Sequence, residues 1–103
     1  MKYGPNVGMI LIHKGIVRGF SRDGSPVKGM VVEYDPSEVE AIVEEMLNRK
    51  GIEHIDVKIN SGRLSVGDEI MTVTVAGRYR RDVLPVMDEL LSRIKAVVKE
   101  REF

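Results

Sequence analysis

The sequence predicts an α+β fold in which strands and helices follow one another in the order ββαββα. Two segments repeat apolar residues at the spacing of an amphipathic helix, and four segments have the β-branched or alternating character of strands. The 103 residues contain no internal repeat and no linker, so we expect one domain over residues 1–103. Helices and strands arranged in this order favour an antiparallel sheet with two main helices.

The first two predicted strands flank a turn. Residues 7–20 are apolar and β-branched, with a loose alternation from His13 onward, and therefore predict a strand. Residues 21–26 combine Ser, Asp, Gly and Pro, a composition typical of turns. Residues 27–34 predict the second strand, which we expect to pair back on the first as a hairpin.

The first predicted helix has recognisable ends. Asp35 can cap it, Pro36 suits the first helical position, and Glu38 completes a pattern like a capping box. Gly51 is suited to end the helix. A single apolar stripe at helical spacing consists of Val39, Ile42, Val43, Met46 and Leu47.

The third block of the chain is again β. Apolar and polar residues alternate over residues 55–59, which predicts a strand with one solvated face. Residues 60–62 interrupt it, and Leu64 and Val66 predict a short extended link. Residues 70–76 predict the next strand.

The last predicted helix carries a proline. Its apolar stripe consists of Val83, Met87, Leu90, Leu91, Ile94, Val97 and Val98. Pro85 is tolerated best in the first turn, where backbone N–H groups have no helical acceptor. We therefore expect the helix to begin near Arg81 or Asp82.

Composition excludes several classes of protein. The chain has 16 basic and 16 acidic residues, so its net charge of zero argues against bulk binding of nucleic acid. It has no cysteine, which excludes disulfides and thiolate metal sites. The longest apolar run, residues 8–12, is too short for a membrane span, and no secretory signal is evident. We expect a cytoplasmic protein that associates with itself or a partner.

The two histidines predict no metal site and no cofactor. His13 and His54 lie far apart, and no carboxylates stand at a recognisable metal-binding spacing from them. A single histidine on a strand is usually structural, although a role as ligand or base stays open.

The charge pattern contains two basic segments. Residues 1–35 and 60–81 carry an excess of basic groups, whereas residues 36–59 are acidic. Arg78, Tyr79, Arg80 and Arg81 stand where a strand gives way to a helix, and such a place suits an anion. The alternative is a solvated basic turn. Arg18, at the end of the first strand, is a second candidate for anion binding.

Taken in order, short motifs along the chain resemble the large, catalytic subunit of molybdopterin synthase. The resemblance covers residues 7–100 roughly. The matching pieces are residues 15–18 (GIVR), 33–34 (EY), 62–69 (GRLSVGDE), 79–82 (YRRD) and 87–90 (MDEL). It implies an α/β hammerhead architecture, and a central homodimer of two large subunits.

The resemblance also implies a reaction. The family adds two sulfurs to cyclic pyranopterin monophosphate to give molybdopterin. Sulfur arrives as a thiocarboxylate on the C-terminal glycine of a small ubiquitin-like partner, whose tail enters a pocket on the large subunit. The family pocket holds the phosphate of the pterin with cationic residues and uses lysine in sulfur transfer.

Several residues take their expected roles from this resemblance. Arg18 and Arg80 match family arginines that bind substrate, and Met87 matches a pocket methionine. Tyr79 stands where the family has histidine, and Arg81 flanks the same segment.

The family's two lysine positions depart from the pattern. They hold Leu91 and Val98, and Lys95 and Lys99 stand nearby as possible substitutes. Either these lysines serve in catalysis, or the chain is a non-catalytic relative that binds an anionic pterin-like ligand or a protein partner.

Overall fold

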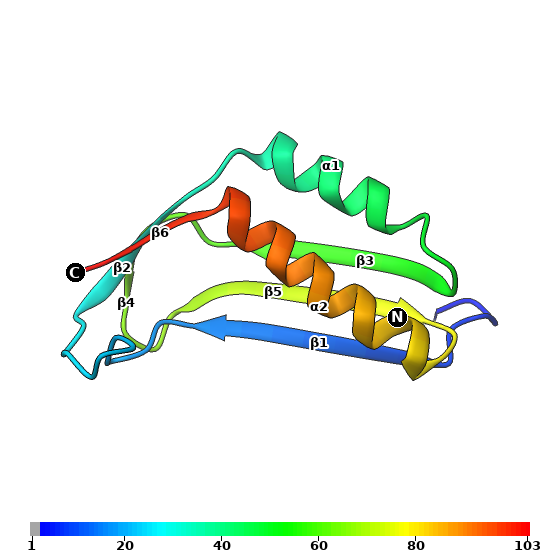
Figure 1. The fold of residues 1–103 in the computed structure, drawn as a ribbon, viewed down its shortest axis with the longest axis horizontal. Helices are drawn as coiled ribbons and strands as arrows, with labels where there is room; N and C mark the ends of the chain where they lie inside the picture. Colours follow the sequence, from blue (N-terminus) through cyan, green and yellow to red (C-terminus); the bar gives the residue numbers. More distant parts are fainter. Residues whose placement is uncertain (1–2) are drawn as a thin grey trace.

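A computed structural model describes residues 3–103, and it has two helices and six strands. Figure 1 shows both helices lying along one large sheet, with a smaller sheet at one end. In chain order the elements are β1 (Met9–Ile16), β2 (Gly29–Glu33), α1 (Pro36–Met46), β3 (Ile52–Ile59), β4 (Gly62–Ser65), β5 (Glu69–Gly77), α2 (Arg80–Val97) and β6 (Lys99–Glu102). The predicted α+β class is confirmed, and the predicted order ββαββα lacks the two short strands β4 and β6.

The large sheet has the order β1-β5-β3 and is antiparallel throughout. Side chains alternate between its two faces because successive residues of a strand point in opposite directions. Met9 and Leu11 of β1 turn toward the core, whereas Ile10 and Ile12 are exposed on the opposite face. The inner face includes Val73 and is covered by α1 and α2.

The first helix begins where the sequence predicts, but it ends at Met46 and not at the expected Gly51. The Asp35 carboxylate accepts a hydrogen bond from the backbone N–H of Ser37 at 2.9 Å, and Pro36 occupies the first turn. The helix ends at Met46 and the chain turns until Gly51, whose φ of +79° is in the left-handed region that glycine favours.

The second helix begins slightly earlier than expected. Tyr79 is its N-cap, and the Tyr79 carbonyl accepts from the N–H groups of Asp82 and Val83. The expected start near Arg81 or Asp82 was therefore wrong by about one residue, and Pro85 lies beyond the first turn. Pro85 has no N–H to offer the Arg81 carbonyl, and both residues are exposed, so water can reach that carbonyl.

The small sheet corrects the predicted hairpin. Its order is β4-β2-β6, so β2 pairs with the two short strands and not with β1. The expected link at residues 64–66 contributes to β4, and the chain leaves α2 after Val97 to form β6. A turn does lie at residues 21–26, but the strand that follows it, β2, belongs to the small sheet and not to the sheet that contains β1.

The core lies between the large sheet and the two helices. Its fully buried side chains include Met46, Val75, Leu90 and Ile94. Of the helices within residues 3–103, neither is both long and apolar enough to cross a membrane.

Candidate functional site

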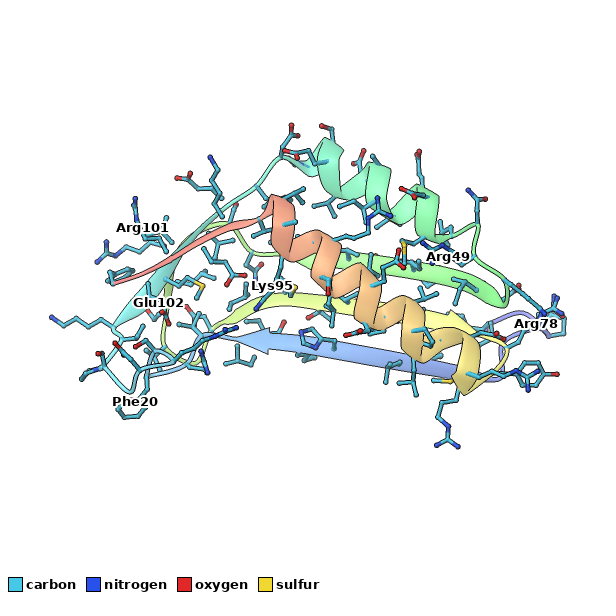
Figure 2. The ribbon with its side chains drawn as sticks, in the orientation of Figure 1. Phe20, Arg49, Arg78, Lys95, Arg101 and Glu102 are labelled. Carbon is cyan, nitrogen blue, oxygen red and sulfur yellow. The ribbon has the colours of Figure 1, made fainter. Side chains whose placement is uncertain are left out.

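A pocket of about 460 Å³ lies where β1 ends, between the second half of α2 and β6. The residues after β1 contribute Arg18 and Arg22, and α2 contributes Lys95. Figure 2 shows Lys95 and Glu102 at this end of the molecule, with Arg78 at the opposite end. The structure thus brings together two of the residues singled out in the sequence, Arg18 and Lys95.

One face of α2 forms a wall of the pocket. Asp88, Leu91, Ser92 and Lys95 stand at positions i, i+3, i+4 and i+7, which a helix places on one side. Leu91 is part of the same apolar stripe that packs on the core, so the stripe runs from the core into the pocket. The wall is therefore apolar toward the core and charged toward the opening.

Arg18 is held in place by the segment that contains the GRLSVGDE motif. The N–H of Val17 donates to the Asp68 carbonyl at 3.0 Å, and the Val17 carbonyl accepts from Gly67 at 2.9 Å. Gly67 has a φ of +92°, and the Asp68 side chain accepts from the Ser65 N–H at 2.8 Å. This motif forms a tight turn that fixes the backbone directly before Arg18.

Arg22 is presented by a loop that is closed on itself. The Asp23 carboxylate accepts from the Ser21 hydroxyl and from the Ser25 N–H, the latter at 2.9 Å. These bonds, the Ser21 hydroxyl first, lower the pKa of Asp23 to about 2. Asp23 therefore stays ionised over the physiological range and keeps the loop folded around Arg22.

The charges around the pocket are mixed. Three cationic side chains, Arg18, Arg22 and Lys95, face three carboxylates, which are Asp88, Glu100 and Glu102. Among the residues that the structure describes, no ion pair involves any of the three cations. Their charge is available to a ligand, and the pocket combines basic with acidic side chains.

A second, more open hollow of about 510 Å³ continues from the first. The two share Arg18, Arg22 and Lys95, and the second adds Ser21 and Asp23 from the loop. The combined site therefore has an apolar inner part and a polar outer part, with the cations between them. An anion joined to a flat apolar group suits such a site.

Tyr79, Arg80 and Arg81 lie at the other end of α2. The Arg81 guanidinium lies over the Tyr79 ring at 4.7 Å, and all three side chains are exposed. Lys95 follows Arg80 by fifteen residues of helix, a rise of about 22 Å. One chain therefore cannot place Arg80 and Arg18 on the same small ligand.

Three other singled-out positions also lie away from the pocket. Met87 is buried in the core with 5% of its surface exposed, and Val98 is buried with 7%. Lys99 is exposed on β6 opposite Glu33 of β2. Of the two expected lysine substitutes, Lys95 is at the pocket and Lys99 is not.

Sequence reasoning missed the polar pocket residues Arg22, Asp88, Ser92, Glu100 and Glu102, and it left a ligand role for His13 open. The spacing of Asp88, Ser92 and Lys95 is a signal that could have shown a polar edge on the last helix. Nothing in the pattern of residues 99–102 predicts a strand beside the pocket. Within residues 3–103, no group of three or more histidine, aspartate or glutamate side chains could hold a metal ion.

Comparisons with known proteins agree with this fold. Residues 1–97 match the family model described as MoaE protein. An uncharacterized protein of Methanocaldococcus jannaschii is 30% identical over 98 residues, which are 91% of this chain and 82% of the relative.

Solved structures give the same result. A molybdopterin synthase from Staphylococcus aureus superimposes with a TM-score of 0.84 at 18% identity, covering 98% of this chain and 77% of the other. A molybdopterin cofactor biosynthesis protein E from Burkholderia multivorans gives 0.75 at 23% identity, covering 96% and 74%. A complex of subunits 1 and 2 of the molybdopterin-converting factor from Helicobacter pylori gives 0.74 at 16%, covering 94% and 66%. The chain therefore belongs to the MoaE family, that of the molybdopterin synthase large subunit, and has a role in molybdenum cofactor biosynthesis.

Proposed function

We propose that this chain is the large subunit of a molybdopterin synthase and works in the cytoplasm. It accepts sulfur from the thiocarboxylate of a small ubiquitin-like partner and transfers it to cyclic pyranopterin monophosphate. The observation that carries the proposal is the convergence of Arg18, Arg22 and Lys95 on one pocket with an apolar wall. A volume of about 460 Å³ is in the range of small-molecule sites.

The proposed roles follow from the chemistry of the side chains. The guanidinium groups of Arg18 and Arg22 suit the phosphate of the pterin, because their forked N–H groups match its oxygens. The Lys95 ammonium, a compact charge, suits the thiocarboxylate that carries the sulfur. Leu91 and Met71 line the apolar part, where a pterin ring fits.

A second copy of the chain explains how Arg80 takes part. In the large sheet, Met9 pairs with Gly77, so the start of β1 lies at the end of the sheet from which the chain continues to Arg80. Ile16 pairs with Glu69, so the other end of β1 is the end that leads to Arg18. If two β1 edges pair antiparallel about a twofold axis, each end meets the opposite end of the other copy. Tyr79 and Arg80 of a second copy then stand beside the pocket, on the same side of the joined sheet.

The free edge of β1 supports this arrangement. Among residues 3–103, β1 has β5 as its only strand partner. Its outward face carries Ile10 and Ile12, which are 40% and 58% exposed. Charges on edge strands usually prevent pairing. The charge that β1 carries, Lys14, is held in an ion pair with Glu69 of β5 at 2.8 Å, and Ile10 and Ile12 leave the rest of the edge apolar.

The decisive experiment is reconstitution. The chain is mixed with the thiocarboxylated partner and the pyranopterin, and dithiolene product is measured. We expect Arg18→Ala and Lys95→Ala each to lower the rate at least about 100-fold. The matched control is Lys58→Ala, an exposed lysine of β3 outside the pocket, with a rate near wild type. A wild-type chain that yields no product beside an active control synthase would contradict the proposal.

Mixing two inactive variants tests the shared site. Arg18→Ala and Arg80→Ala are each expected to be inactive alone. Random exchange makes half of the dimers mixed, and each mixed dimer has one intact site, so about a quarter of wild-type activity returns. Ile12→Lys should give a monomer by sedimentation and no activity, whereas Asp56→Lys on β3 leaves the dimer intact. Absence of recovery in mixtures that do form dimers would show that the two arginines do not share a site.

The mixed charge of the pocket favours one alternative, a non-catalytic member of the family. Asp88, Glu100 and Glu102 offset the three cations and weaken the hold on a phosphate. Such a protein would bind the pterin or the small partner without forming product. Binding measured by calorimetry, together with an absence of product in the reconstituted mixture, would identify it.

A further inference from the structure

His13 occupies a position on β1 that the strand pattern reserves for an apolar residue. Met9 and Leu11, which precede it on the inner face, pack against the core. Its pairing partner across the sheet is Val73, which is completely buried. An imidazole at the third inward position stands where the core gives way to the pocket, and it lines that pocket.

The ring of His13 is open toward the pocket. The side chain is half-buried, and none of the side-chain hydrogen bonds or ion pairs within residues 3–103 involves it. A Cβ placed on Gly15, the next inward residue, would lie 3.8 Å from Nε2 of His13 and 3.4 Å from Cγ of Met71. The ring therefore reaches over the space that the missing side chain of Gly15 leaves.

Charged groups from three parts of the fold line the same pocket as this ring. The segment after β1 supplies Arg18 and Arg22, α2 supplies Asp88 and Lys95, and β6 supplies Glu100 and Glu102. The neighbouring parts of β5 and β2 are apolar, with Ile70, Met71 and Met30. The pocket lining thus has three basic and three acidic side chains, with the His13 ring among them.

His54, the second histidine, offers a contrast. It lies on β3 and is exposed, with Ala76 as its pairing partner. Its ring meets Tyr3 edge to face at 5.9 Å between centroids, and it does not line the pocket. The molecule therefore contains one imidazole at the site and one that serves as an internal control.

We propose that His13 is a further ligand-binding residue of this pocket, and that its protonated imidazole contacts the phosphate group of an anionic ligand. The inference rests on the proposed function because it concerns the same site. A protonated imidazole is an N–H donor with a positive charge, so it binds an anion more tightly than the neutral ring does. Imidazole is the side chain that ordinarily changes charge between about pH 5 and 8. Anion binding should therefore weaken as pH rises through that interval.

Sulfate is a suitable probe because its charge stays constant over this interval, unlike that of phosphate. The experiment follows the ring Cε1–H signals of the two histidines by NMR while sulfate is added to the full chain at several pH values. We expect sulfate to move the His13 signal and to leave that of His54 unchanged. Sulfate affinity should fall about tenfold between about pH 5.5 and 8 in the wild type and in His54→Gln.

Two variants of His13 complete the test. His13→Gln keeps a hydrogen-bonding side chain without the charge, and His13→Phe suits the apolar inner face and so protects against a failure to fold. Both should bind sulfate weakly and almost independently of pH. If they retain the tenfold pH dependence of the wild type, His13 does not contact the anion and the inference is wrong.

The outcome for this residue is separable from that for the proposed function. If sulfate binds in an Arg18-dependent manner but moves neither histidine signal, the inference fails and the anion pocket stands. If His13-dependent sulfate binding is present and the reconstituted mixture forms no dithiolene, the proposed function fails and the inference stands. No sulfate binding to the wild type at any pH would overturn the inference.

Discussion

The two three-stranded sheets of this molecule differ in strand length and in burial. In β1-β5-β3 the strands have eight or nine residues, and β5 is buried along most of its length, at residues 70–71, 73 and 75–77. In β4-β2-β6 they have four or five, and all four residues of β6 are exposed. Figure 1 shows the second sheet at the end of the molecule away from the start of α2.

The difference separates the support of the fold from the boundary of the site. The large sheet and its helices bury nearly all of the core, whereas the small sheet adds Met30 and Val32 to its margin. The pocket lies where the two meet, since β6 brings Glu100 and Glu102 against residues positioned by β1 and α2. Damage to the large sheet should unfold the protein, and damage to the small sheet should alter the site first.

The largest expected effect comes from the core beside the large sheet. Leu90 on α2 is completely buried, so Leu90→Ala should lower the free energy of unfolding by about 3 kcal/mol through lost burial and a cavity. Leu84 on the same helix is 47% exposed, and Leu84→Ala should cost less than about 1 kcal/mol. Urea unfolding followed by circular dichroism measures both. Equal losses would mean that the core does not lie where the structure places it.

The helices and the strands of the large sheet could be predicted because their signals are local, whereas the pairing of β1 with β5 could not. Eleven and eighteen residues of helix give a clear period, and the Asp35 cap marks a start. The small sheet could not be predicted, because β4 and β6 are four residues long with no period of their own. β6 forms because it pairs with β2, where Met30 lies opposite Glu102 although the two are far apart in the sequence. Whether so short a segment becomes a strand depends on this tertiary pairing and not on its own residues.

A smaller effect is expected from crowding the centre of the small sheet. A Cβ on Gly29 of β2 would lie 2.3 Å from the Leu64 carbonyl oxygen and 2.6 Å from the Phe103 ring, so β4 or the end of the chain must move. Gly29→Ala should therefore lower the free energy of unfolding by about 2 kcal/mol. It should also alter sulfate affinity, because β6 carries the pocket carboxylates Glu100 and Glu102.

The matched control for that change is Gly19→Ala. A Cβ there would meet only Val66 Cγ1 at 3.7 Å, an ordinary contact, so stability should stay within about 0.5 kcal/mol of the wild type. Unfolding curves of both variants and sulfate titrations provide the comparison. Equal stability of Gly29→Ala and Gly19→Ala would show that Leu64 and Phe103 do not pack against Gly29 as closely as the structure places them.

The site was predicted where single residues carried a chemical signal. Arg18 was a candidate from its place at the end of the first strand and Lys95 from the resemblance to the large subunit, and both line the pocket. Met87 and Leu91 stand on the same helical stripe and have different surroundings. Period alone cannot separate them, because the stripe runs from the core into the pocket. Glu100 and Glu102 could not be predicted as pocket residues, because the sequence gives no signal for β6.

A still smaller effect should separate the two phenylalanines. The Arg63 guanidinium of β4 lies over the Phe103 ring at 3.9 Å, whereas Phe20 is 63% exposed and its ring has no such partner among residues 3–103. Phe103→Ala should lower the free energy of unfolding by about 1 kcal/mol, and Phe20→Ala by less. Because Phe103 lies beside β2, sulfate affinity should also change in the first variant only. Identical urea midpoints for the two variants would leave the cation–π contact without a role.

The smallest effect concerns the helix pair, away from both sheets. Arg93 of α2 donates to Glu45 of α1 at 2.6 Å, and Arg49 bonds Glu89 at 2.5 Å. The hydrogen bond from Arg93 and its charge hold the pKa of Glu45 below its ordinary value of 4.5. A carboxyl with a lowered pKa in the folded state stabilises the protein above its ordinary pKa and loses that contribution as pH falls below it.

Arg93→Gln should therefore be less stable than the wild type at about pH 7, and the gap should narrow at about pH 3. The effect is small because these side chains are exposed and salt screens them. Asp23 and Asp35, whose pKa values are also lowered, are present in both proteins and cancel in the difference. Urea midpoints at the two pH values provide the measurement. If the two proteins differ in urea midpoint as much at about pH 3 as at about pH 7, Arg93 stabilises the helix pair through its contact with Met46 and not through Glu45.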